Sequence, residues 1–195
     1  MPRRAAAGDR PRTERAGRAA GRRAGPGRAG LSHLDARGRA RMVDVTPKPE
    51  TAREARARVT LRMRPATLAA IRSRRLAKGD VLGVARLAGI MAAKKTAELI
   101  PLCHPLRLTG VEVHFAADPT RAAMHIEIAV RTVDKTGVEM EALTAAAVAG
   151  LALYDMVKAV DRGLVLTDLC LVEKSGGRSG HWLRPGAGRR RARAR

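Results

Sequence analysis

Three stretches of the chain alternate hydrophobic and polar residues, the pattern of a strand with one face buried and the other in water. They are residues 56–64, 109–117 and 123–133. Turn-forming residues, Asp118-Pro-Thr-Arg121, separate the second stretch from the third, so these two strands are expected to form a hairpin. Short apolar segments predict two further strands, at residues 42–45 and 164–172.

Two other segments space their apolar residues as helices do. Pro65 occupies a position favoured in a first helical turn, and it predicts a helix from residue 66 to about residue 75. A second helix is predicted over residues 81–100, where Asp80 is a natural N-cap and Pro101 ends the helical spacing.

The longest apolar segment, residues 142–160, carries only two charges, Asp155 and Lys158. Its alanines and leucines predict a helix that is packed on most sides. The predicted order is therefore strand–strand–helix–helix–strand–strand–helix–strand. Antiparallel strands with the helices on one face make an α+β fold, ferredoxin-like in outline.

The chain of 195 residues has a formal net charge of +21, and most of this excess lies at its ends. Residues 1–30 have a net charge of +7 and residues 184–195 a net charge of +6, together 13 of the 21. Both ends consist mainly of Arg, Gly, Ala and Pro and cannot bury enough apolar surface to offset chain entropy. We expect disordered tails at residues 1–30 and 183–195 around one folded domain, residues 31–182.

The same composition narrows the class of protein. No apolar segment follows the first arginines as a secretory signal requires, and no charge-free run is long enough to cross a membrane. Two cysteines do not make a disulfide framework, so the cytoplasm is the expected location. A basic tail can bind nucleic acid non-specifically, but three aromatic residues offer few platforms for stacking bases. We predict neither a membrane protein nor specific nucleic-acid recognition.

Asp155 and Lys158 lie three residues apart and so share one face of the apolar helix. Where water is scarce, such a pair is costly to leave unpaired and suited to moving protons. The alternative is a surface ion pair of little energetic weight.

Two carboxylates, Glu139 and Glu141, precede the predicted apolar helix. If this segment is extended, alternate residues point the same way and both carboxylates face one site. If Glu141 instead lies in the first turn of the helix, its negative charge serves the helix dipole.

Cys103 and His104 lie in a loop bounded by Pro101 and Pro105. Two adjacent ligand types without a second spaced pair are weak evidence for zinc, so we predict no metal site. A neutral histidine in such a loop more often forms hydrogen bonds or exchanges protons.

Lysines at four positions are suited to binding phosphate oxygens: Lys78, Lys94, Lys95 and Lys174. The glycine-rich loop after Lys174 lacks the Gly-x4-Gly-Lys-Ser/Thr order of a P-loop, which excludes an NTPase of that class. Together with the His, Asp, Glu and Lys residues above, the lysines predict one pocket in an enzyme that acts on a phosphorylated small molecule.

Several longer strings follow one another along residues 31–182: Met42-Val-Asp-Val45, Lys78-Gly-Asp80, Ala88-Gly-Ile90 with Ala93-Lys-Lys95, Pro101-Leu-Cys-His-Pro-Leu106, Lys135-Thr-Gly-Val-Glu-Met-Glu-Ala-Leu-Thr-Ala145, Tyr154-Asp-Met-Val-Lys-Ala-Val160 and Lys174-Ser-Gly-Gly177. This series resembles the cyclic pyranopterin monophosphate synthase (MoaC) family of molybdenum cofactor biosynthesis. Because many motifs occur in the same order, the resemblance is specific.

The resemblance implies a lyase that uses no metal and no other cofactor. Its substrate would be (8S)-3′,8-cyclo-7,8-dihydroguanosine 5′-triphosphate, made from GTP by a radical SAM partner enzyme. Its products would be cyclic pyranopterin monophosphate and diphosphate. The resemblance also implies a homohexamer, a trimer of dimers of ferredoxin-like subunits, with active sites at the dimer interfaces.

Family roles fall on particular residues of this chain. The resemblance implies catalysis by Asp155, Lys158 and Lys78. Substrate binding is expected from Leu102, Cys103, His104, Glu139, Met140, Glu141 and Lys174, and we add Lys94 and Lys95 as ligands of the triphosphate. Arg178 departs from the family, whose members usually have Lys there; because arginine does not readily give up a proton, we assign no catalysis to it.

Two other classes of protein stay open at this point. One is a basic RNA- or DNA-binding module, favoured by the net charge but disfavoured by the concentration of that charge in the tails. The other is an inactive scaffold in a cofactor-assembly complex.

Overall fold

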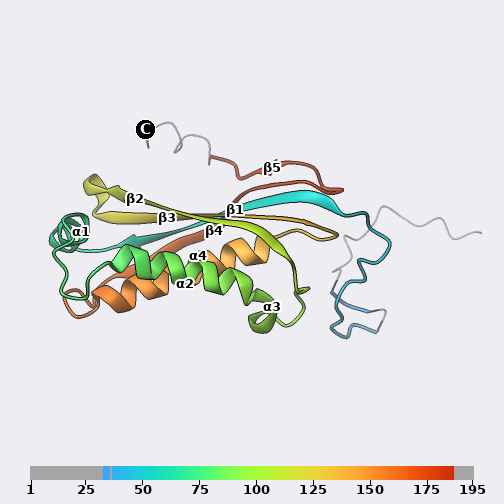
Figure 1. The fold of residues 1–195 in the computed structure, drawn as a ribbon, viewed down its shortest axis with the longest axis horizontal. Coiled ribbons are helices and arrows are strands. Elements are labelled where there is room, and N and C mark those ends of the chain that lie inside the picture. The colour runs from blue at the N-terminus through green and yellow to red at the C-terminus, as the bar shows by residue number, and fades with distance from the viewer. Residues whose placement is uncertain (1–32, 36, 187–195) are drawn as a thin grey trace, which may run out of the picture. The chain divides into compact units, whose positions relative to one another are not determined.

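The computed structural model describes residues 33–35 and 37–186, and within them five strands form one antiparallel sheet in the order β2-β3-β1-β4-β5 (Figure 1). The strands are β1 (Thr51–Arg62), β2 (Leu108–Asp118), β3 (Ala123–Asp134), β4 (Val165–Ser175) and β5 (Trp182–Leu183). The predicted hairpin is confirmed, since β2 and β3 pair across a 3₁₀ turn, Pro119–Arg121. The predicted tails lie outside the described residues, except for residues 183–186.

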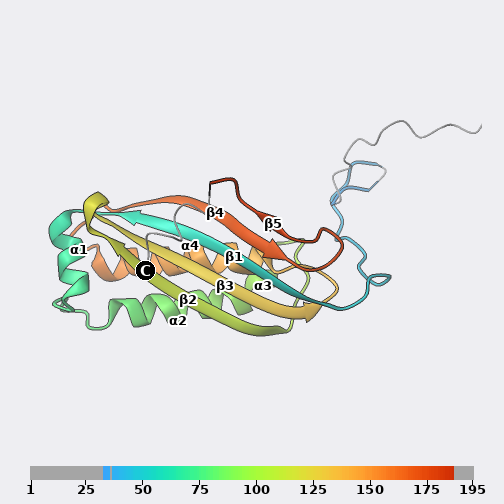
Figure 2. The same cartoon turned by 90° about the horizontal axis from the view of Figure 1, so that it is seen from above.

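Four helices complete the described part of the chain: α1 (Pro65–Arg72), α2 (Val81–Lys94), α3 (Thr96–Leu99) and α4 (Glu139–Val157). The two long helices, α2 and α4, lie side by side and antiparallel on one face of the sheet (Figures 1 and 2). This arrangement confirms the α+β class. It also places the first turn of α4 near the end of α2.

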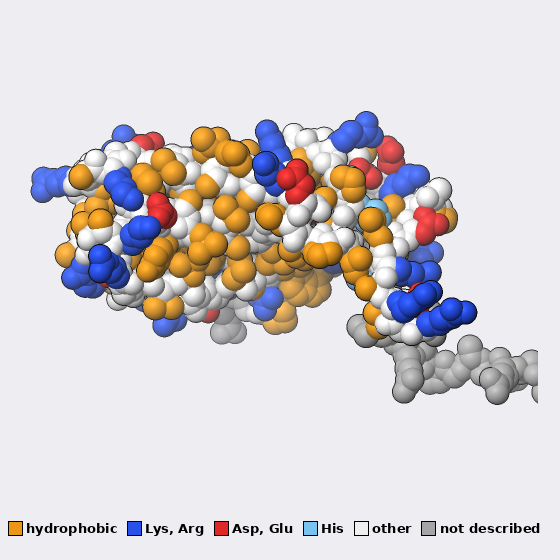
Figure 3. Space-filling view, turned by 90° about the horizontal axis from the view of Figure 1, so that it is seen from below, with side chains coloured by type: hydrophobic (Ala, Val, Ile, Leu, Met, Phe, Trp, Pro, Cys, Tyr) orange, Lys and Arg blue, Asp and Glu red, His pale blue; other side chains and the backbone are white. Residues whose placement is uncertain are grey.

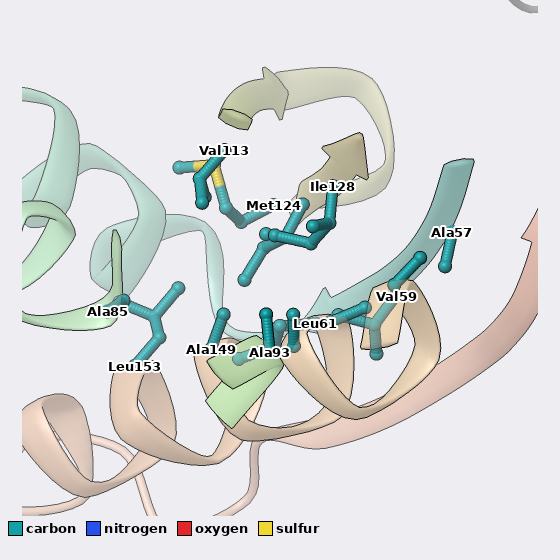
Figure 4. Close-up of a cluster of buried hydrophobic side chains, with 14 of the residues drawn as sticks. Ala57, Val59, Leu61, Ala85, Ala93, Val113, Met124, Ile128, Ala149 and Leu153 are labelled. Carbon is teal, nitrogen blue, oxygen red and sulfur yellow. The ribbon is translucent and has the colours of Figure 1, made fainter. Parts of the chain in front are cut away.

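The core lies between the sheet and these two helices. Alternate residues of β1, such as Val59 and Leu61, point toward Ala149 and Leu153 of α4 (Figure 4). A Cβ atom added to Gly89 of α2 would lie 3.2 Å from the carbonyl oxygen of Ala145, so α2 and α4 approach closely and a larger residue here would require a small shift. The many alanines of α4 therefore serve close packing.

By length and composition, α4 passes as a membrane span, the only such helix among the described residues. Residues along its length nevertheless lie in the core, from Ala142 to Val157. One side of the helix is thus buried in the core, while Leu151 on another side is exposed.

Several predicted boundaries are wrong. Residues 42–45 pair with no strand within the described part of the chain. Strand β1 begins at Thr51, five residues before the predicted start, and so includes Arg53. The predicted helix 81–100 is interrupted at Lys95, where φ is −107° and ψ is 11°. The first helix stops at Arg72 because Arg74 takes a positive φ of 55°.

Candidate functional site

Three predicted catalytic residues meet at the C-terminal end of α4. The Nζ atom of Lys158 lies 2.7 Å from Oδ1 of Asp155, one turn away on the same helix. Lys78 lies in the loop between α1 and α2, and its Nζ donates a hydrogen bond to the carbonyl oxygen of Asp155 at 3.0 Å. The same Nζ lies 3.8 Å from Oδ2 of Asp155. Two amines therefore hold one carboxylate.

The prediction that water is scarce around this pair is wrong. The side chains of Asp155 and Lys158 are 59% and 52% exposed, because they lie on the outer face at the end of α4 rather than in its packed centre. A hydrogen bond and the charge of Lys158 lower the pKa of Asp155, with a smaller contribution from Lys78. Asp155 in turn raises the pKa of Lys158. At neutral pH the carboxylate and the ammonium are both charged.

A second group of predicted residues meets at the N-terminal end of α4. Glu139 begins the helix, and its Oε1 accepts a hydrogen bond from Nζ of Lys174 at 2.8 Å. Glu141 lies two residues further on, and only 4% of its surface is exposed. Both glutamates occupy the first turn of the helix, so the extended alternative is wrong and the helical position of Glu141 is confirmed.

Glu141 differs from the other carboxylates because it is buried. Burial raises its pKa to about 7, and the nearby charge of Glu139 contributes in the same direction. Burial also raises the pKa of the Cys103 thiol, as does the charge of Glu141. Near neutral pH, Glu141 is poised to accept or donate a proton while Cys103 keeps its own.

The loop that follows α3 brings three predicted residues to this same end: Leu102, Cys103 and His104, all half-buried. His104 is fixed by a hydrogen bond of 2.8 Å between its Nε2 atom and the carbonyl oxygen of Val43. The segment predicted as a first strand is thus held by a side chain instead of a sheet. Lys94 and Lys95 lie exposed at the end of α2, and Met140 lies exposed in α4.

One residue that the sequence did not single out, Arg53, organises this end of the molecule. Its Nε and Nη2 atoms donate hydrogen bonds to the carbonyl oxygens of Asp134 and Lys135, each at 2.9 Å. A Cβ atom added to Gly177 would lie 2.0 Å from its Nη1 atom. Arg53 therefore anchors the segment before Glu139 and lies against the loop after Lys174. The alternation of polar and apolar residues in β1 could have indicated Arg53, but the predicted strand began at residue 56, after this arginine.

The two groups of residues lie too far apart to form the single predicted pocket within one subunit. Asp155 lies sixteen positions after Glu139 along one continuous helix. At about 1.5 Å per residue, this corresponds to roughly 24 Å. We call the two groups the N-terminal cluster (Glu139, Glu141, Lys174, Cys103 and His104) and the C-terminal cluster (Lys78, Asp155 and Lys158).

Comparisons with known proteins decide the family. A model of the MoaC family matches residues 42–177. The chain belongs to the MoaC family. It is 62% identical over 156 residues to a cyclic pyranopterin monophosphate synthase of Thermomicrobium roseum, covering 80% of this chain and 94% of the relative.

Two more relatives carry the same name. That of Pelotomaculum thermopropionicum is 61% identical over 158 residues, covering 81% of this chain and 93% of the relative. That of Heliobacterium modesticaldum is 58% identical over 154 residues, covering 79% and 97%. The prediction of a lyase of the MoaC family is thereby confirmed.

The face of the sheet opposite the helices bears on the rival nucleic-acid-binding class. At the centre of this face in the MoaC-family chain, Arg56 forms ion pairs with three glutamates, at 2.7 Å from Glu54, 3.6 Å from Glu127 and 3.7 Å from Glu173. Arg131 likewise pairs with Glu54 at 2.9 Å. The charges of Arg56 and Arg131 are largely balanced by these glutamates, which disfavours phosphate binding at these two residues.

Proposed function

We propose that this chain converts (8S)-3′,8-cyclo-7,8-dihydroguanosine 5′-triphosphate into cyclic pyranopterin monophosphate and diphosphate, in molybdenum cofactor biosynthesis in the cytoplasm. A radical SAM enzyme would supply this substrate from GTP. The observation that carries the proposal is the identity of about 60% to relatives named for this product, over nearly their whole length. The Lys, Asp and Glu residues of the two clusters support it chemically.

The C-terminal cluster is proposed to carry out proton transfer. Because Asp155 raises the pKa of Lys158, the resting ammonium is a proton donor and Asp155 is the group that holds it in place. Lys78 lies close enough to take part or to bind a phosphate oxygen. Protons would pass here as the cyclised nucleotide opens and rebuilds as a pyranopterin.

The N-terminal cluster is proposed to bind the ring and the phosphates. Lys174 would leave Glu139 for a triphosphate oxygen, with Lys94 and Lys95 nearby as further cations. Leu102, Cys103, His104 and Met140 would line the ring, and Glu141, with a pKa of about 7, would exchange protons with it. In the last step, a ribose-derived hydroxyl attacks the α-phosphate and diphosphate leaves. No step in this scheme uses a metal.

The proposed assembly is a homohexamer, a trimer of dimers of ferredoxin-like subunits. The strand order β2-β3-β1-β4 with two helices on one face supports the subunit fold. The helical layer displays apolar side chains to solvent, as oligomer interfaces do: Val84, Leu87, Met91 and Leu151 (Figure 3). The separation of roughly 24 Å supports an active site shared between subunits, with the N-terminal cluster of one facing the C-terminal cluster of another.

Supplying the purified protein with the cyclised GTP intermediate tests the reaction. We expect stoichiometric release of diphosphate and appearance of the pterin, detected by its fluorescence after oxidation. GTP itself, as the control substrate, should yield neither product. A folded protein that releases no diphosphate from the cyclised intermediate would leave only the scaffold interpretation.

Mixing two inactive variants tests the shared site. Lys174→Ala damages the N-terminal cluster and Asp155→Asn the C-terminal cluster. In a two-fold symmetric dimer that carries one of each, one of the two sites receives only intact clusters. Random reassociation should then restore up to about one quarter of the wild-type activity. If both clusters acted within one subunit, the mixture would stay inactive.

A further inference from the structure

A cavity lies between α1, the beginning of α2 and the edge strand β2, and no residue of the two clusters lines it. Its volume of about 370 Å³ is within the range of small-molecule pockets. Its apolar lining includes Ile71, Val81 and Met124, which are buried, and the half-buried ring of Phe115. The cavity thus offers an apolar surface large enough for a ring system.

Three arginines, Arg72, Arg74 and Arg86, also line this cavity. Among the described residues, none of the three forms an ion pair with a carboxylate. One carboxylate, Asp80, lines the cavity as well, but its Oδ1 accepts a hydrogen bond from the backbone of Gly83 at 2.9 Å and caps α2. Three positive charges against one negative favour an anionic ligand.

Two of these arginines, Arg86 and Arg74, are held in defined conformations. The guanidinium of Arg86 lies over the ring of Phe115, 5.4 Å from its centroid, and donates a hydrogen bond to the carbonyl oxygen of Val113. Arg74 holds a positive φ of 55°, a conformation that costs an ordinary residue energy and is found more often at binding sites. A fixed cation therefore lies beside an aromatic ring and an apolar floor.

We propose that this cavity binds a nucleotide at a site separate from the two clusters. Its phosphates would pair with the arginines, which match phosphate oxygens in geometry and charge. Its base would lie against Phe115 and the apolar floor. The loop from Arg74 to Asp80 also contains Lys78 of the C-terminal cluster. A ligand in the cavity would therefore affect the position of Lys78. The proposal does not depend on the reaction assigned above.

Isothermal titration calorimetry with ADP tests this site on the intact protein. We expect saturable binding of one ADP per subunit, with adenosine and inorganic diphosphate each at least about tenfold weaker because each lacks one half of the interaction. Arg74→Asn is the sharpest variant, since asparagine tolerates positive φ and the guanidinium is removed without straining the backbone. It should weaken ADP about tenfold or more, and Arg72→Ala should act in the same direction without altering the melting temperature.

Lys158→Ala and Lys174→Ala serve as controls that damage the two clusters but not the cavity. Both should bind ADP as the wild type does. Binding that survives Arg74→Asn combined with Arg72→Ala, or that disappears in either lysine variant, would place ADP elsewhere and overturn the proposal. So would diphosphate binding as tightly as ADP, or no ADP binding at millimolar concentration.

Discussion

The two ends of α4 handle charge in opposite ways. At the C-terminal end, Asp155 is exposed and held by Lys158 and Lys78, so its pKa is lowered. At the N-terminal end, Glu141 is buried and its pKa is raised to about 7. One helix thus presents a carboxylate that stays charged and a carboxyl group that titrates near neutrality.

The difference shows that charge placement, and not helix composition, sets the chemistry of each end. Water surrounds the C-terminal cluster in the subunit, so a bound substrate or a second subunit is needed to exclude it. Within the N-terminal cluster, Glu141 is already desolvated by the fold, while the side chains of Lys174 and Glu139 remain 28% and 30% exposed. Substitutions at the two ends should therefore separate activity from stability.

The largest effect is expected on turnover at the exposed end. Asp155→Asn and Lys158→Ala should each lower kcat about a hundredfold or more, because both remove a proposed proton-transfer group. Their melting temperatures should match the wild type, since both side chains are more than half exposed. Steady-state diphosphate release and thermal unfolding measure the two quantities.

Arg162→Ala is the matched control, because this exposed residue lies near the same end of α4. It should retain wild-type turnover. Full activity in both Asp155→Asn and Lys158→Ala would reduce the C-terminal cluster to a surface ion pair.

Glu141→Gln should change the pH dependence of stability, besides removing the proton that Glu141 is proposed to exchange with the substrate. The raised pKa means that the folded state binds more protons than the unfolded state between pH 4.5 and about 7, so stability falls as the pH rises through this range. The gap between these two pKa values corresponds to roughly 3 kcal/mol at most. The variant should lose this decline, as measured by urea unfolding at pH 5 and pH 8.

Glu98→Gln, an exposed glutamate of α3, provides the control and should keep the wild-type decline. Carboxylates with a lowered pKa, such as Asp161, lose their stabilising effect only as the pH falls below about 4. They do not disturb the comparison. An equal decline in wild type and Glu141→Gln would show that Glu141 is ionised throughout.

The contrast between the ends also explains what the sequence could predict. Alternation and apolar spacing located β2, β3 and α4 well, because these elements bury one face or most of their surface. The burial of Glu141 was not predictable, since it depends on how the first turn of α4 packs with the loop at Cys103. The exposure of Asp155 was not either, because an apolar segment does not reveal which of its faces reaches the surface.

Contacts between residues far apart in the sequence could not be predicted either. Arg53 donates hydrogen bonds to a segment 81 and 82 residues away along the chain and lies against Gly177, and only the folded sheet brings these parts together. The distance between the clusters follows from the length of α4, which was predictable. The motifs were nevertheless assigned to one pocket, because sequence order gives no information on which subunit completes a site.

Gly176→Ala should weaken substrate binding through the loop at the N-terminal cluster. Gly176 has a φ of +92°, and an added Cβ atom would lie 2.2 Å from the backbone carbonyl oxygen of Ala52, which cannot move aside easily. The shift should reach Lys174, two residues earlier, and raise KM about tenfold with a smaller change in kcat. Substrate titrations of diphosphate release measure both.

Gly180→Ala separates conformational strain from this clash. Gly180 also has a positive φ, +62°, but nothing lies within 4 Å of an added Cβ atom. Its KM should stay near that of the wild type. An equal rise in KM in both variants would indicate that loop strain matters and that the position of Lys174 does not.

The smallest effect is expected on the reactivity of Cys103. Burial and the charge of Glu141 both raise the pKa of its thiol, so little reactive thiolate forms at pH 8. In Glu141→Gln the charge is gone and burial remains, so alkylation by iodoacetamide should become about two- to threefold faster. Both proteins would carry Cys170→Ser, since the second cysteine is also a free thiol. Unchanged alkylation would mean that burial alone protects Cys103, and that the charge of Glu141 does not reach the loop at the N-terminal cluster.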